Sequence, residues 1–343
     1  MTFDLEFVQV LWFFLLGILL TGYAILDGFD LGVGILHFVA RTDTDRRLFM
    51  NSIGPLWDGN EVWLVTFGGA LFAAFPDVYA SAFSGFYMPF MLLLFALIFR
   101  AVSMEFRSKF NFKAWRACWD VAFCAASAAA AFLFGVAVGN IMIGLPIDET
   151  RSFSAPLLSL LTPYPILCGL FVVSMFALHG SIYLYLKLEG ELQERVHTWI
   201  WRAFGVFLVL FLFLTMYTLQ AVPRATYNFT HYPWAWIVVG LNVLAIANIP
   251  RAVFHGRPVY AFVSSCCTIA AFNFLFAVAL FPNLLVSNID PEYHLTVFNA
   301  SSSEKTLWLM TLFAVIGIPF VLAYTAVIYW TFRGKVELGK FSY

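Results

Sequence analysis

Long apolar stretches separated by short polar segments make up almost the whole chain. Each stretch approaches or exceeds the roughly 20 residues that an α-helix needs to cross the hydrocarbon core of a bilayer. The pattern therefore predicts nine transmembrane helices, the first of them long enough to tilt or to extend beyond the membrane. Their expected positions are residues 8–39, 52–75, 79–102, 117–139, 160–187, 197–220, 234–252, 259–281 and 306–332.

Composition favours an integral membrane protein over a soluble domain. Of the 343 residues, 62% are hydrophobic and 11% are charged, and the mean hydropathy is +0.85. Soluble domains carry about 25% charged residues. The expected fold class is an all-α integral membrane protein, with one polytopic domain over residues 1–343. Helices 1–4 would occupy about 8–139, helices 5–8 about 160–281, and helix 9 about 306–332.

The distribution of lysine and arginine predicts the orientation. If the N-terminus lies outside, the predicted inner segments hold 16 basic residues and the outer segments hold 3, which accounts for all 19. Such a bias toward the cytoplasmic side is what the positive-inside rule requires. The opening residues MTFDLEF lack the positive charge of a secretory signal peptide, so the first stretch is expected to be a helix of the protein itself. The C-terminus would then be cytoplasmic.

Acidic residues interrupt two of the predicted spans. Asp27 and Asp30 lie three residues apart within LDGFDLGVG, and Asp58 and Glu61 have the same spacing within WDGNEVW. This spacing places both members of a pair on one helix face. Ionisable groups inside a membrane are costly, and their presence usually indicates function. Both pairs are expected in the cytoplasmic half, where they could accept protons or pair with a cation.

Structural interpretations of these acids also stay open. The first helix could end early, which would leave Asp27 and Asp30 in an interfacial loop. Asp58 could be an N-cap with Glu61 in the first helical turn, where the helix dipole favours negative charge. Trp57, taken alone, is typical of the aromatic belt at a membrane interface.

Arg100 ends the third predicted span, within reach of Asp30 or Asp58. An arginine–carboxylate pair there would lower the cost of burying either charge. The alternative is an anchor at the membrane interface, a role that fits Arg107 and Lys109 better than Arg100.

Histidines and cysteines give little support for a metal or haem site. Of the six histidines, four lie nearer loops or span ends, whereas His37 and His179 fall within predicted spans. They could meet on the inner side as a pair of haem ligands, but packed or hydrogen-bonded histidines are the favoured interpretation. The five cysteines form no CxxC pattern, so no metal site is predicted.

Several motifs together resemble subunit II of cytochrome bd-type quinol oxidases. They are, among others, GFDLGVG (28–34), GPLWDGNEVW (54–63), GGALFAAFPDVYA (68–80), FRAVSMEFRSK (99–109) and ALHGSIYLYLKLEGEL (177–192). The resemblance covers almost the full length. It implies two four-helix bundles plus one peripheral helix, in agreement with the nine predicted spans, and a multi-pass location in the bacterial inner membrane.

The resemblance also implies a place in aerobic respiration. In this family a partner, subunit I, carries two b haems and one d haem and oxidises quinol, while the protons for water come from the cytoplasm. The present chain would bind no haem or metal; it would support subunit I, close the oxygen-reducing site and contribute to the proton path. Lipid, small single-span subunits and a structural quinone would be its other contacts, and nucleic acid is not an expected partner.

By match to the family motifs, the residues expected to matter are Asp30, Trp57, Asp58 and Arg100. Asp58 is the preferred acid of the proton path at the subunit interface. Asp30 and Arg100 would form an ion pair facing subunit I. Two other functions stay open: a purely structural scaffold for subunit I, and a secondary transporter, a class that also uses broken helices and intramembrane acids.

Overall fold

The computed structural model describes residues 4–339, and these residues are predominantly helical. The α-helices are α1 (Leu5–Ile35), α2 (Asp43–Ile53), α3 (Trp57–Ala74), α4 (Pro76–Gly85), α5 (Tyr87–Phe106), α6 (Lys113–Ile143), α7 (Pro163–Lys187), α8 (Gly190–Ala221), α9 (Tyr227–His231), α10 (Ala235–Phe254), α11 (Pro258–Leu280) and α12 (Glu304–Thr331). Short 3₁₀ turns and one small antiparallel ribbon complete the chain: η1 (His37–Val39), η2 (Leu157–Leu160), η3 (Pro223–Ala225), η4 (Pro291–Tyr293), β1 (Asn283–Leu285) and β2 (Leu295–Thr296).

Eight helices between residues 4 and 339 are long and apolar enough to cross a membrane, namely α1, α5, α6, α7, α8, α10, α11 and α12. They correspond to every predicted span except the second. At that position α3 has 18 residues, but its first turn reads WDGNE. The polar turn that makes this helix a candidate site also removes it from the set of clearly apolar spans.

The predicted boundaries of the third span are wrong. Residues 76–85 form the separate helix α4, and α5 begins only at Tyr87 and continues to Phe106. Pro76 begins α4, where the missing N–H of proline removes no helical hydrogen bond. Because no charge marks the break at Phe86, the apolar pattern runs through it. The first span also ends before residue 39: α1 stops at Ile35, and η1 follows.

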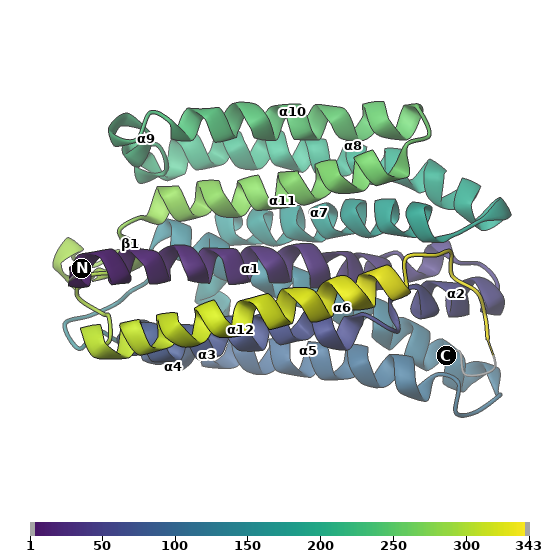
Figure 1. Ribbon diagram of the computed structural model, residues 1–343, viewed down its shortest axis with the longest axis horizontal. Helices are drawn as coiled ribbons and strands as arrows, with labels where there is room; N and C mark the ends of the chain where they lie inside the picture. The colour runs from purple at the N-terminus through teal and green to yellow at the C-terminus, as the bar shows by residue number, and fades with distance from the viewer. Residues whose placement is uncertain (1–3, 340–343) are drawn as a thin grey trace.

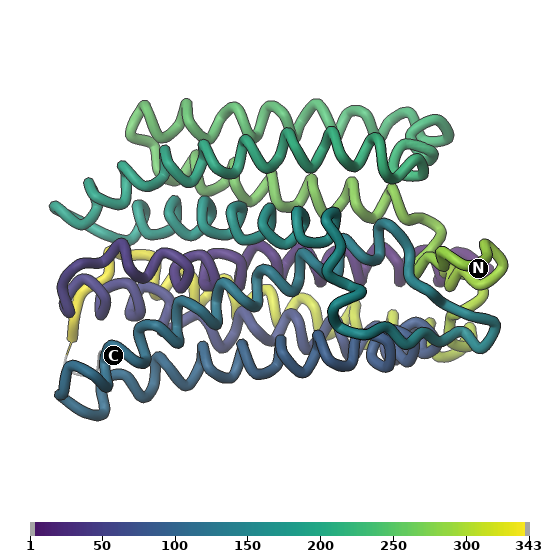
Figure 2. The backbone as a smooth tube through the Cα atoms, turned by 180° about the vertical axis from the view of Figure 1, so that it is seen from behind, coloured from purple at the N-terminus to yellow at the C-terminus, as the bar shows by residue number. Residues whose placement is uncertain are grey.

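The long helices lie roughly side by side around α1 (Figure 1). α1 packs against α3 and α6 in the first half of the chain and against α7 and α11 in the second half. α5 packs on α6, α8 on α7, α10 on α11, and α12 along α1 and α3. Figure 2 shows that the connection between α6 and α7 lies at the end of the molecule that carries the N-terminus. α2 lies at the opposite end (Figure 1).

Two glycines let α1 and α7 approach backbone to backbone. A Cβ atom on Gly32 would lie 2.0 Å from the carbonyl oxygen of Phe176, and one on Gly180 would lie 2.4 Å from the carbonyl carbon of Gly32. Small residues allow membrane helices to pack this closely. The contact fixes α1, with its acidic residues, against the second half of the chain.

The amphipathic helix α2 connects the two halves through charge. It begins with a capping box, in which Thr42 and Asp45 each accept a hydrogen bond from the backbone N–H of the other. Asp45 also forms an ion pair of 2.8 Å with Arg195 of α8. Burial raises the pKa of Asp45, but the hydrogen bonds from Arg195 and Thr42 outweigh it and leave the pKa below its ordinary value.

The last helix, α12, is held at both ends while its middle stays exposed. Near its start, the Trp12 indole N–H donates to the Leu307 carbonyl at 3.0 Å. At its end, the Lys187 ammonium donates to the carbonyls of Phe332 and Gly334. These contacts place the C-terminal turn of α12 beside the acidic residues described below.

The α1–α7 crossing predicts that Gly32→Ala destabilises the protein. The added methyl would meet backbone atoms that cannot move aside, and overpacking of this kind costs about 1–3 kcal/mol. Gly17→Ala, on the same helix, is the matched control because a Cβ there meets nothing within 4 Å. We expect thermal unfolding of the purified protein to show a lower midpoint for Gly32→Ala and an equal or higher one for Gly17→Ala. Equal midpoints would contradict the close contact.

Candidate functional site

A fully buried arginine, Arg100 of α5, lies at the centre of an acidic cluster. Its Nη2 atom lies 2.7 Å from Asp27 Oδ1, and its Nη1 atom lies 3.1 Å from Glu61 Oε1. Asp30 is more distant, with its Oδ2 atom 3.9 Å from Arg100 Nη2. Both aspartates are fully buried, whereas Glu61 retains 26% of its side-chain exposure. Carboxylates from α1 and α3 therefore meet one guanidinium from α5.

The expected ion pair between Asp30 and Arg100 is present at 3.9 Å, and its orientation toward another subunit stays a prediction. Asp27, not Asp30, is the closer partner of Arg100, and all three side chains are enclosed within this chain. The strongest contact of Asp30 is a hydrogen bond of 2.7 Å from the Asn60 amide. Asn60 in turn accepts a 2.9 Å hydrogen bond from the Tyr329 hydroxyl of α12. The last helix thus closes the cluster.

The acids of α1 lie inside a continuous helix. α1 runs unbroken from Leu5 to Ile35, so Asp27 and Asp30 do not occupy an interfacial loop. Asp58 is not an N-cap either, because Leu56 holds that position and makes no side-chain cap hydrogen bond. Asp58 is exposed and Trp57 is half-buried. Asp58 is therefore exposed at the N-terminal end of α3, and Glu61, one helical turn further along, contacts the buried Arg100.

A second buried cluster surrounds Asp120 of α6. One carboxylate oxygen lies 2.6 Å from both His37 Nε2 and Arg107 Nε, and the other lies 2.8 Å from Arg46 Nη1. Arg107 also pairs at 2.7 Å with Asp43 of α2. The side chain of Arg107 is only 1% exposed. The expectation that Arg107 is an interfacial anchor is therefore wrong.

Sequence reasoning did not single out Asp120. The available signal was its dipeptide, Trp119-Asp120, which matches Trp57-Asp58 at the start of another apolar helix. The two clusters lie at successive levels along α5, because seven residues separate Arg100 from Arg107 at its C-terminal end, or about 10 Å of helix axis. Asp43 is the most exposed member of the second cluster, with 45% of its side chain exposed to solvent.

The two candidate haem ligands are both engaged by protein groups. His37 bonds to Asp120, whereas His179 lies 2.7 Å from the Ser265 hydroxyl and 3.0 Å from the Ile25 carbonyl. They contact different residues and form no facing pair, as expected for hydrogen-bonded histidines. Within residues 4–339, no group of three or more His, Cys, Asp or Glu side chains is arranged to hold a metal ion.

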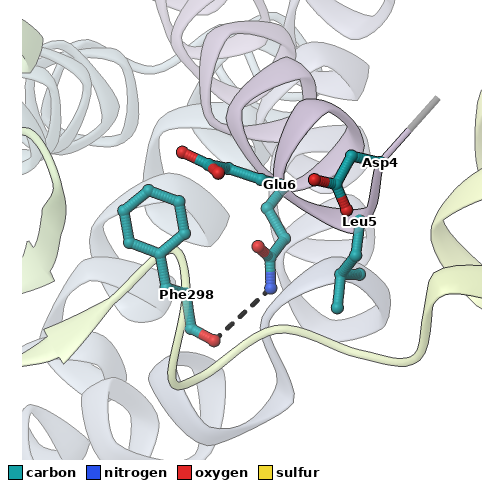
Figure 3. Close-up of a pocket in the computed structure, with 5 residues that line it drawn as sticks. Asp4, Leu5, Glu6 and Phe298 are labelled. Carbon is teal, nitrogen blue, oxygen red and sulfur yellow. Dashed lines mark hydrogen bonds between the residues drawn. The ribbon is translucent and has the colours of Figure 1, made fainter.

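A shallow hollow lies at the N-terminal end, far from both clusters along the helices. Figure 3 shows it between the start of α1 and the loop before α12, lined by Asp4, Leu5, Glu6 and Phe298. The only hydrogen bond drawn there runs from the Gln9 amide to the Phe298 carbonyl at 3.4 Å. Its polar groups do not converge on a common point, so it is a weaker candidate than the buried charges.

Comparison with known proteins places this arrangement in a family. The family model of cytochrome bd terminal oxidase subunit II matches residues 8–332. The chain belongs to this family. It is 36% identical to cytochrome bd-I ubiquinol oxidase subunit 2 of Escherichia coli K12, over 97% of this chain and 96% of that protein. It is 34% identical to cytochrome bd ubiquinol oxidase subunit 2 of Bacillus subtilis, over 95% and 96%.

A solved structure supports the fold. The bd oxidase from Geobacillus thermodenitrificans contains a chain that superposes with a TM-score of 0.78 at 16% identity, covering 95% of this chain and 98% of that one. At this identity the likeness concerns the fold alone. As a bd-type subunit II, the protein is a multi-pass inner-membrane subunit of a terminal oxidase. Its two charge clusters are therefore part of a respiratory membrane protein.

The Arg100 cluster predicts a large loss of stability on Arg100→Gln. The substitution leaves Asp27, Asp30 and Glu61 without their shared cation, and removing one partner of a buried ion pair costs about 3–5 kcal/mol. Arg151→Gln is the matched control, because Arg151 pairs with Asp77 at 2.8 Å but both side chains are about half exposed. Exposed pairs contribute about 0–1 kcal/mol.

Thermal unfolding of the purified complex measures both variants. We expect a markedly lower midpoint, or loss of assembled protein, for Arg100→Gln and little change for Arg151→Gln. Similar midpoints for the two variants would contradict the buried cluster.

Proposed function

We propose that this chain is the haem-free subunit II of a bd-type quinol:oxygen oxidoreductase and that it contributes to proton delivery from the cytoplasm. Family membership and the printed names of its relatives, ubiquinol oxidase subunit 2, support the assembly with a subunit I. The orientation that we propose has the N-terminus outside and the C-terminus inside. α3 is the ninth span, α1, α3, α5 and α6 form one bundle, α7, α8, α10 and α11 the other, and α12 is peripheral.

The observation that supports proton delivery is a series of acidic residues that runs from the N-terminal end of α3 to the centre of the first bundle. Asp58 is exposed, Glu61 is partly exposed and bonded to Arg100, and Asp27 and Asp30 are fully buried. Three carboxyl groups around one guanidinium would carry an excess of buried negative charge if all were ionised. Such an excess is strongly disfavoured at low dielectric, so the cluster has a reason to hold an exchangeable proton.

The residues of this chain then have separate tasks. Asp58 collects a proton at the inner surface, and Glu61, one helical turn deeper, passes it toward Arg100 and the α1 aspartates. Arg100 keeps the carboxyl groups together and compensates their charge. Asn60 and Tyr329 orient Asp30 through hydrogen bonds of 2.7 and 2.9 Å and exclude lipid from that side.

We assign the haems of the complex, two b and one d, to subunit I. The histidines of this chain do not fit haem ligation, because His37 is bonded to Asp120 and His179 to Ser265 and Ile25. The contribution of this chain to oxygen reduction is then lateral closure of the site and proton supply. A structural quinone and small single-span subunits remain part of the family expectation and have no assigned position here.

A scaffold without a proton role is the second candidate. The observation in its favour is that the ion pairs cross-link helices: Arg107 alone joins α5 to α2 and α6. A transporter is less well supported, because the buried charges gather toward one end of the helices rather than around a central substrate site.

Substitutions of the acids in the first turn of α3 distinguish the proton-path hypothesis from the scaffold hypothesis. We expect Asp58→Asn and Glu61→Gln to slow quinol-driven oxygen consumption by up to about 100-fold, near the lower end of what a positioned proton-transfer group contributes. Haem content per complex should be unchanged. Glu191→Gln, at an exposed acid near the start of α8, is the matched control and should keep its activity. Loss of haem together with activity would favour the scaffold, and full activity in both variants would contradict the proton role.

A further inference from the structure

The second half of the chain has an unusual charge distribution. Residues 195–289 include no aspartate or glutamate, although they contain five arginines. Arg195 pairs with Asp45 of α2, and Arg224 lies near the opposite end, where it bonds the Met142 carbonyl. The other three, Arg202, Arg251 and Arg257, have no carboxylate within ion-pair distance among residues 4–339. We call these three side chains the arginine rim.

The rim residues lie near the same end of neighbouring helices. Phe207 of α8, Ile249 of α10 and Ser265 of α11 line the same small cavity, so these three residues lie at about the same height along the helices and serve as a reference point. From that level, at 1.5 Å per residue, Arg202 is about 7.5 Å, Arg251 about 3 Å and Arg257 about 12 Å away. All three displacements point toward the end that carries α2, because α8 and α11 begin there and α10 ends there (Figure 1).

Each rim arginine is positioned by an uncharged neighbour. The Arg202 guanidinium lies 5.0 Å from the ring centre of Trp199, and that of Arg257 lies 5.8 Å from Tyr260. Arg251 donates to the Asn248 side chain at 3.3 Å, and Asn248 donates to Ser264 of α11 at 2.8 Å. Aromatic and amide contacts orient a guanidinium without neutralising it.

Three arginines of the first half of the chain differ from the rim in having ion-pair partners. Arg46, Arg107 and Arg116 all pair with aspartates, at 2.6 to 3.0 Å. These three arginines are compensated by carboxylates of neighbouring helices, whereas the rim arginines are not. α10 and α11 contain no acid, and Glu191 and Glu194 of α8 form no ion pair with the rim.

Exposed apolar side chains lie directly beside the rim. Phe254 is 77% exposed, Val259 56% and Tyr260 62%. A surface that presents aliphatic and aromatic groups next to unpaired guanidiniums matches the boundary between acyl chains and phosphate headgroups. Basic sites between transmembrane helices on the cytoplasmic side bind anionic lipid headgroups, and a guanidinium matches the geometry of a phosphate oxygen pair.

We propose that the arginine rim binds the phosphate headgroup of an anionic phospholipid, with the acyl chains lying along the exposed side chains of α10 and α11. The site depends on the charge of this surface and not on the proton role of Asp58, so the two proposals can fail separately. It would attach an annular lipid to the half of the subunit that lies away from the buried acids.

Lipid selectivity of the intact complex tests the proposal. The complex, purified with its partner subunit, is reconstituted into phosphatidylcholine vesicles with trace spin-labelled phosphatidylglycerol or spin-labelled phosphatidylcholine. The immobilised fraction gives the relative association of each lipid. Three proteins are compared: wild type, the rim variant Arg202→Gln/Arg251→Gln/Arg257→Gln, and a control variant with the same loss of charge at exposed inner positions of the first half, Arg41→Gln/Lys109→Gln/Lys113→Gln.

We expect wild type to prefer phosphatidylglycerol about fivefold or more, the factor for one arginine near an anionic surface. The rim variant should lose this preference and the control variant should keep it. High salt should weaken the preference without abolishing apolar contact. Equal losses in both variants would show that only bulk charge matters, and absence of selectivity in wild type would also overturn the proposal. Loss of the partner subunit from the rim variant would instead assign the rim to a protein interface and reject the lipid.

Discussion

A guanidinium with no exposure to solvent, inside a protein with a lipid-facing surface, constrains much of this fold. Arg100 is tolerable only because carboxylates from two other helices reach it at 2.7 and 3.1 Å. Each of those helices must therefore hold a particular rotation and depth. The acid on α1 has to face α5, and the polar first turn of α3 has to lie against both.

Other features of the fold serve the same requirement. Gly32 and Gly180 bring α1 against α7, so that α1 is enclosed on the side away from Arg100. Tyr329 of α12 reaches back to Asn60 and covers Asp30. The second cluster, around Asp120, repeats the arrangement nearer the surface and connects it to α2. Both buried charge clusters thus lie in the first half of the chain, whereas residues 195–289 of the second half contain arginines but no acid.

Much of this organisation could be predicted from the sequence, and its failures have physical causes. Long apolar runs identified the membrane helices, and the cost of charge in lipid identified Asp27, Asp30, Glu61 and Arg100. Side-chain pairing was harder, because Asp27 and Asp30 lie on one face and only the rotation of α1 decides which is nearer Arg100. Arg107 was interpreted as an interfacial anchor and Asp120 was not singled out, because a residue near the end of an apolar run looks interfacial until its neighbours are known. The break at Phe86 left no polar signal.

The central claim is that this subunit contributes carboxyl groups and packing to a terminal oxidase while the redox centres belong to its partner. The most direct test is a reduced-minus-oxidised absorption spectrum of the chain purified alone, and then of the same chain with its co-purifying subunit. The account predicts no haem bands for the chain alone and b- and d-type haem bands for the complex. Haem bands in the isolated chain that disappear on His37→Gln or His179→Gln would contradict it.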